Sequence, residues 1–224
     1  MNRTKLADRT LPTYTRGEEL FNMISHIVGG AFGVTVLALC CVVASLHRNY
    51  WGLAGGIIYG LMMIFVYTMS SVYHGLRNEA PKKVLQVLDH CSIYAMIFGT
   101  YMPVLLTGIR AYDKGVFYAL LAALTVGTAV GVTFTAIDFH RYKYIAKGGY
   151  FIVGWSAIFA LRPLLAAFGW PFFLWLLAGG VVYCLGMIFF VLGIWHKFCH
   201  SVFHLFILAG SVLQFIGIFR YCIL

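Results

Sequence analysis

The chain has 224 residues, of which 62% are hydrophobic and only 10% are charged. So few polar residues cannot cover a water-soluble globule, so the composition excludes an ordinary soluble domain and indicates an integral membrane protein. The net charge of +9 is not arranged as a basic stripe on a soluble domain, and we therefore expect no nucleic-acid partner.

Apolar stretches long enough to cross a bilayer follow one another from residue 24 almost to the end of the chain. Crossing the hydrocarbon core takes about 20 apolar residues in a helix, and short polar joints separate the stretches. The sequence predicts an all-α, seven-transmembrane helix bundle, with a cytoplasmic N-terminal segment at 1–23 and one transmembrane domain at 24–224. The seven stretches are 24–46, 52–74, 86–108, 115–137, 148–168, 171–193 and 201–222.

The Lys and Arg residues predict the orientation, because short loops rich in these residues stay on the cytoplasmic side. Of the 16 Lys and Arg residues, five fall on the side opposite the N-terminus and the other eleven fall on the N-terminal side. The N-terminus is therefore expected to be cytoplasmic and the C-terminus extracytoplasmic. The five residues on the opposite side are Arg48, Arg110, Lys114, Arg162 and Arg220.

Polar residues that are costly inside a membrane gather at the cytoplasmic ends of four predicted spans. The first span opens with EELFNMISH at 18–26, and the second ends with SSVYH at 70–74. The third opens with LDH at 88–90, and the last opens with HKFCHSVFH at 196–204. The predicted topology brings these distant segments to one leaflet, which is the main functional signal in the sequence.

The last of these segments can supply two ligands to one metal ion. His200 and His204 are four residues apart, so they share one face of a helix at a spacing of about 6 Å. With His74 they would form a three-ligand site of the catalytic zinc type, although copper, iron and nickel also accept imidazole. Asp89 could orient or deprotonate a water molecule, or support a histidine ligand. Ser70 lies one turn from His74 and could donate a hydrogen bond to an oxyanion.

Each of these residues also has a simpler interpretation. Histidines at a membrane interface are often amphipathic boundary residues. Glu18 and Glu19 lie in the first turn of a helix, where acidic residues stabilise the N-terminus whether or not they serve a site. His196 and His204 are roughly 12 Å apart along a helix, so one ion cannot bind all three histidines. His196 lies at the polar joint, which favours His200 and His204 as the ligand pair.

Four motifs in this order resemble the hemolysin III family, within the wider progestin and adiponectin receptor family. They are EExxNxxSH at 18–26, SxxxH at 70–74, LDHCSIYAMIFGTYMP at 88–103 and HSVFH at 200–204. The resemblance covers nearly the whole chain. It implies a seven-helix protein of the bacterial plasma (inner) membrane with its N-terminus inside.

The resemblance also implies a zinc ion near the cytoplasmic face. The ligands it assigns are His74, His200 and His204. The residues expected around them are Asp89, Ser70, Asn22, His26 and Glu19.

The wider superfamily is similar to alkaline ceramidases, which implies hydrolysis of a lipid amide or ester with zinc as cofactor and membrane lipids as partners. Two alternatives remain open at this point. One is a membrane-active cytolysin or pore-former, as the family name implies. The other is a receptor-like regulator of membrane homeostasis in which zinc is structural. The sequence does not set the oligomeric state.

Overall fold

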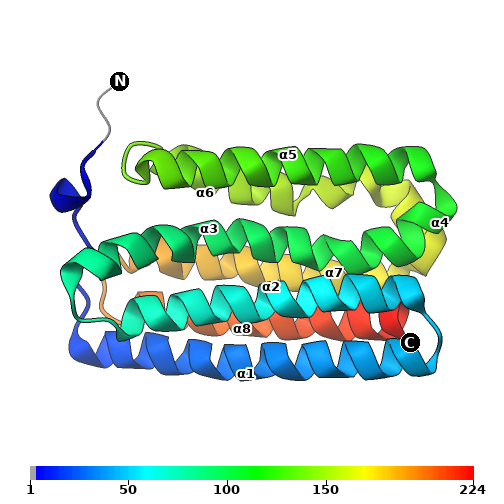
Figure 1. Cartoon of the computed structure of the whole chain (residues 1–224), viewed down its shortest axis with the longest axis horizontal. Helices are drawn as coiled ribbons and strands as arrows, with labels where there is room; N and C mark the ends of the chain where they lie inside the picture. The colour runs from blue at the N-terminus through cyan, green and yellow to red at the C-terminus, as the bar shows by residue number, and fades with distance from the viewer. Residues whose placement is uncertain (1–3) are drawn as a thin grey trace.

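The computed structural model of the protein describes residues 4–224. Most of these residues form helices that lie side by side in a bundle (Figure 1). No strand occurs within that range, so the all-α prediction is confirmed. The α-helices are α1 Arg16–Leu46, α2 Tyr50–Gly75, α3 Glu79–Val104, α4 Arg110–Tyr112, α5 Lys114–Asp138, α6 Lys143–Gly154, α7 Leu161–Leu192 and α8 Cys199–Ile218. Short 3₁₀ helices cover Leu6–Asp8 and Ser156–Ala160, and π-helical turns cover Leu105–Ile109 and Phe219–Ile223.

Six helical stretches in the described chain are long and apolar enough to cross a membrane, and the longest of them is Lys143–Leu192. This 50-residue stretch contains a break at Gly169, whose φ of 77° and ψ of 174° are not helical. A positive φ costs little for glycine, and Pro171 then suits the first turn of the helical part that follows. The break therefore has a local cause in the sequence.

The chain reverses direction at Gly169. Before Gly169, α6 runs alongside α3 in the same direction. Tyr94 of α3 donates to the carbonyl of Ala146, and Tyr101, further along α3, donates to the carbonyl of Gly154, further along α6. After it, α7 runs antiparallel to α8, with Gly179 against Gln214 and Gly186 against Phe206. Since α3 and α8 point the same way in Figure 1, the two halves of the stretch are antiparallel. Seven membrane crossings remain a prediction.

The first helix begins earlier than the predicted span. Thr15 accepts a hydrogen bond from the backbone N–H of Glu18, and the Glu18 carboxylate accepts one from the N–H of Thr15. This reciprocal capping box starts α1 at Arg16, so the predicted boundary between residues 23 and 24 falls inside a continuous helix. Residues 1–3 of the predicted N-terminal segment lie outside the described residues.

The segment before α1 lies across the end of the bundle where α2 ends and α8 begins (Figure 1). The N–H of Thr4 donates to a carboxylate oxygen of Asp138 at 2.8 Å, and Lys83 donates to the carbonyl of Ala7 at 3.0 Å. These contacts join the N-terminal segment to α3 and α5. The same end of the bundle carries the histidines.

Candidate metal centre

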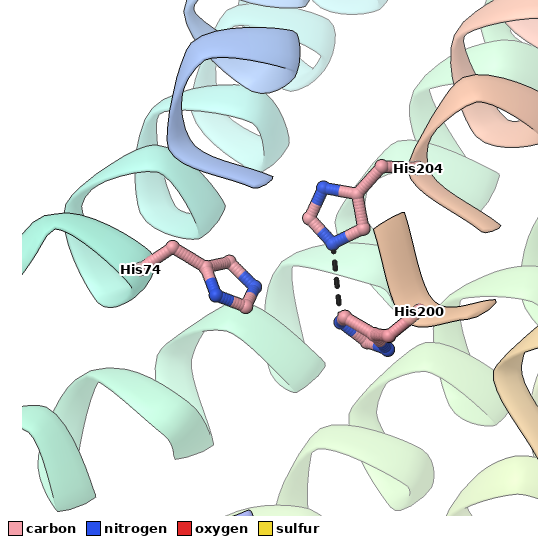
Figure 2. Close-up of side chains that lie close together, drawn as sticks. All are labelled: His74, His200 and His204. Carbon is pink, nitrogen blue, oxygen red and sulfur yellow. Dashed lines mark hydrogen bonds between the residues drawn. The ribbon is translucent and has the colours of Figure 1, made fainter. Parts of the chain in front are cut away.

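Three histidines from two helices converge at the end of the bundle where α2 ends and α8 begins (Figure 2). His74 lies in the last turn of α2, and His200 and His204 lie in the first turns of α8. One nitrogen atom of each ring lies within 4.8 Å of the others, and all three residues are buried. The Nε2 atoms of His200 and His204 are 3.1 Å apart. These three side chains could hold a metal ion, as the sequence predicted.

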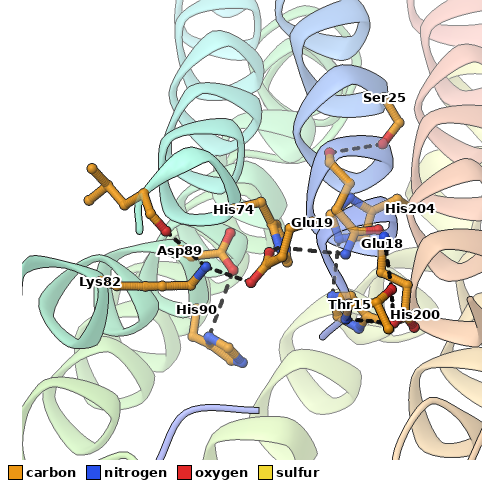
Figure 3. A network of polar contacts seen from close by, with 12 residues as sticks. Thr15, Glu18, Glu19, Ser25, His74, Lys82, Asp89, His90, His200 and His204 are labelled. Carbon is orange, nitrogen blue, oxygen red and sulfur yellow. Dashed lines mark hydrogen bonds and ion pairs between the residues drawn. The ribbon is translucent and has the colours of Figure 1, made fainter. Parts of the chain in front are cut away.

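The orientation of His74 is set by a carboxylate on α1. The Nδ1 atom of His74 donates to Glu19 Oε2 at 2.6 Å, and the amide nitrogen of Asn22 lies 3.5 Å from the same Nδ1. Glu19 is held in turn by the ammonium group of Lys82, 2.5 Å from its other oxygen (Figure 3). This bond leaves the lone pair on Nε2, as in the carboxylate–histidine pairs of metal sites.

The donor set fits a divalent cation such as zinc. His74 Nε2 is buried and has no hydrogen-bond partner in residues 4–224, although a buried polar atom normally has one. The free nitrogen belongs to the same triad as His200 and His204. Three imidazole nitrogens that leave further coordination positions open are typical of a catalytic zinc site. Imidazole nitrogen alone does not distinguish zinc from other transition metals.

Two aromatic rings pack on the triad from other segments. His26 of α1 lies nearly parallel to His204, with ring centroids 3.8 Å apart. Tyr14, just before α1, stacks on His200 with centroids 4.9 Å apart. Burial, followed by the negative charges of Glu19, Asp89 and Glu18, raises the pKa of the Tyr14 hydroxyl above its usual value. The N-terminal segment therefore covers one side of the triad with a neutral phenol.

The two acidic residues of the first turn of α1 have different roles. Glu18 belongs to the capping box, and it also accepts a hydrogen bond from the N–H of Phe198 at 2.7 Å. Phe198 has a left-handed backbone with φ of 59° and immediately precedes α8. Glu18 thus ties the start of the histidine-bearing helix to α1, whereas Glu19 contacts a metal-binding candidate directly.

Asp89 and Ser70 face the same interior space as the triad but do not touch it through hydrogen bonds. Both line a cavity that is also lined by His200 and His204. Within residues 4–224, no hydrogen bond joins either residue to the three histidines. Asp89 lies 3.9 Å from Nδ1 of its neighbour His90 (Figure 3). Their catalytic roles therefore remain predictions.

The cavity extends from the histidines along the interior of the bundle and has a volume of about 320 Å³. Apolar side chains of α2, α3, α7 and α8 form most of its wall, and Ile109 and Leu164 line its far end. Phe151 of α6 and Trp155, the residue after α6, also line it, although each is 40% exposed on the outer surface. The cavity therefore reaches the outside next to α6.

Three residues that contact or approach the site were not singled out from the sequence. Lys82 holds Glu19, Tyr14 covers His200, and Lys147 lines the cavity. The sequence offered only their charge or aromatic character near a predicted span end. His196, by contrast, is exposed in the turn before α8 and lies outside the triad, as expected.

Comparison with known proteins places the site in a family context. A family model described as "Haemolysin-III related" matches residues 14–215, which include every candidate site residue. The "Hemolysin-3 homolog" of Bacillus subtilis (strain 168) is 30% identical over 212 residues, covering 94% of this chain and 97% of that protein. "Hemolysin-3" of Bacillus cereus is 32% identical over 206 residues, with 91% of each chain covered. The human "Monocyte to macrophage differentiation factor" is 26% identical over 189 residues, covering 80% of this chain and 76% of that protein.

Proposed function

This chain belongs to the haemolysin-III related family, and from that premise we propose that it is a zinc-dependent hydrolase acting on an amide or ester of a membrane lipid. One observation carries the proposal: two histidines of the buried triad, His200 and His204, line a largely apolar cavity that reaches the outer surface. A purely structural metal site has no need of a 320 Å³ space beside it. The mostly apolar wall of the cavity suits the acyl chain of a lipid.

We also propose that the bundle crosses the bacterial plasma membrane seven times, with the N-terminus inside. The reversal at Gly169 divides the stretch Lys143–Leu192 into two antiparallel parts, which supports seven crossings. The excess of Lys and Arg residues on the N-terminal side supports the orientation. The histidines would then lie near the cytoplasmic face.

The residues of the site have separate tasks in the proposed reaction. When bound, zinc supplies Lewis acidity, which acidifies water and polarises a carbonyl group. His74, His200 and His204 would hold it, with Glu19 fixing the tautomer of His74. Asp89 would accept the proton of the attacking water and pass it to the leaving group. Ser70 would donate a hydrogen bond to the substrate oxygen as negative charge develops there.

Zinc content and lipid turnover, measured on one preparation, test the proposal. Wild-type protein should carry stoichiometric zinc and release fatty acid from a ceramide-like or ester lipid. Changing both His200 and His204 to Ala should remove the zinc and the turnover. The control is His196→Ala, which changes an exposed histidine of the preceding turn and should retain both. Folded wild-type protein without zinc would rule out the metal site.

A cytolysin is the second candidate, because the similar protein of Bacillus cereus carries the name "Hemolysin-3". Lysis of erythrocytes by wild-type protein that turns over no lipid in a broad panel would favour this function. A receptor-like regulator with structural zinc is the third candidate, and the relationship to a human differentiation factor favours it. Stoichiometric zinc with neither turnover nor lysis would support that candidate.

A further inference from the structure

A single lysine lies on the cavity wall close to the histidines. Lys147 of α6 is half-buried and lines the same cavity as Asp89 and His200. Its ammonium nitrogen is 4.4 Å from the centre of the Phe190 ring, and that ring lies 5.6 Å from the ring of His200. One aromatic ring therefore separates this positive charge from the metal centre.

Lys147 has no carboxylate partner. In the described chain, no Asp or Glu oxygen lies within salt-bridge distance of its ammonium group, whereas Lys82 and Lys83 each pair with a glutamate. A charged group beside an apolar wall in a membrane protein is costly. The cation–π contact with Phe190 is worth about 0.5–2 kcal/mol and offsets only part of that cost. An anion bound in the cavity would complete the site.

The position of Lys147 matches the place where a lipid can enter. Phe151, one turn further along α6, and Trp155, directly after the end of that helix, line the cavity and are also exposed. The Trp155 ring reaches α7, where a Cβ built on Gly180 would lie 3.7 Å from it. A lipid that passes between α6 and α7 with its chain in the cavity would bring its polar end to Lys147.

We propose that Lys147 determines the lipid specificity of the cavity by binding the anionic group, a phosphate or a carboxylate, of a lipid whose acyl chain lies inside. The assignment rests on the proposed function for the nature of the occupant, but binding can be measured without turnover. The competing explanation is that Lys147 only extends its ammonium group to the membrane interface, as lysines near helix ends often do.

Native mass spectrometry of the full-length protein in detergent distinguishes these explanations. The protein is titrated separately with phosphatidylglycerol, stearate and neutral diacylglycerol. Lys147→Met keeps an unbranched side chain and removes the charge. It should weaken binding of phosphatidylglycerol or stearate by about tenfold, the loss expected for one charge-assisted hydrogen bond. Diacylglycerol binding should not change.

Two variants serve as controls. Lys147→Arg keeps the charge and should retain the preference for the anionic lipid. Lys143→Met removes an exposed charge one turn earlier on α6 and should leave all three affinities unchanged.

The lipid affected identifies the anion: loss with phosphatidylglycerol alone indicates a phosphate, and loss with stearate alone indicates a carboxylate. Unchanged affinity for both lipids in Lys147→Met would overturn the proposal, as would an equal loss for diacylglycerol. A wild-type protein that selects anionic lipids through Lys147 but hydrolyses none would refute the hydrolase and leave the specificity site standing.

Discussion

The carboxylate of Glu19 on α1 holds the imidazole of His74 on α2 through a 2.6 Å bond to Nδ1. The two residues are 55 positions apart in the sequence. The bond fixes which nitrogen of His74 carries the proton and leaves Nε2 free for the other two histidines of the triad. A metal ligand that loses such a partner becomes less basic and less well oriented.

Glu19→Gln should therefore weaken zinc binding by roughly 10- to 100-fold without removing a ligand. Competition with a chelating dye measures the affinity. Glu79→Gln is the matched control, because Glu79 also lies in the first turn of a helix and its side chain is 82% exposed. Equal zinc affinities in wild type and Glu19→Gln would mean that Glu19 only stabilises the helix N-terminus and does not support the metal site.

Tyr14 should slow the exchange of metal with the solvent. Its ring stacks on His200 at 4.9 Å and belongs to a segment held across the end of the bundle. An aromatic pair of this kind contributes about 0.5–1.5 kcal/mol beyond its buried area. In Tyr14→Ala, extraction of zinc by a chelator should be about threefold to tenfold faster, with the stoichiometry at saturation unchanged.

The rate of extraction after rapid mixing gives the comparison. Tyr118→Ala removes an exposed tyrosine of α5 and should behave as wild type. If Tyr14→Ala releases zinc at the wild-type rate, the N-terminal segment does not control access to the site.

Sequence patterns predicted the helical class and the histidine pair because both depend on local periodicity. Apolar runs of spanning length mark the helices, and the i, i+4 spacing places His200 and His204 on one face. The break at Gly169 also has local causes, which is why 148–168 and 171–193 could be separated in the sequence. The membrane span predicted at 24–46 is shorter than α1, because the capping box of Thr15 and Glu18 extends the helix beyond its apolar run.

The contacts of the site were less predictable, because they depend on how each helix is rotated about its axis. Both Glu18 and Glu19 were open to a capping role, yet only Glu19 faces His74. Lys82 reaches Glu19 from a different helix. Tyr14 approaches His200 through a segment with little regular structure, and no periodicity in the sequence reports such a contact.

Close packing between α1 and α2 should contribute measurably to stability. A Cβ built on Gly29 would lie within 2.5 Å of the Tyr67 ring, which packs edge-on against His26 with centroids 5.0 Å apart. Gly29→Ala should therefore displace Tyr67 and cost about 1–3 kcal/mol.

Thermal unfolding in detergent, followed by circular dichroism, should show a lower Tm for Gly29→Ala. Gly148→Ala is the control, because a Cβ built on Gly148 would have no neighbour within 4 Å. Equal Tm values in Gly29→Ala and wild type would mean that α1 and α2 can separate slightly without loss of stability.

Asp89 should be needed for turnover but not for metal binding. It lines the cavity together with the histidines and makes no hydrogen bond to them within the described residues. Asp89→Asn preserves the size of the side chain and removes its ability to accept a proton. Zinc content should stay at the wild-type level, while the kcat for lipid hydrolysis should fall by about 100-fold or more.

Asp113→Asn provides the matched control for this loss. Asp113 accepts a hydrogen bond from the N–H of Val116 at the start of α5, a role that Asn also fulfils. The kcat of the Asp113→Asn variant should equal that of wild type. Loss of zinc from Asp89→Asn would make Asp89 part of the metal centre itself, and full activity would exclude it as the proton acceptor. Only retained zinc with lost turnover assigns the proton transfer to this carboxylate.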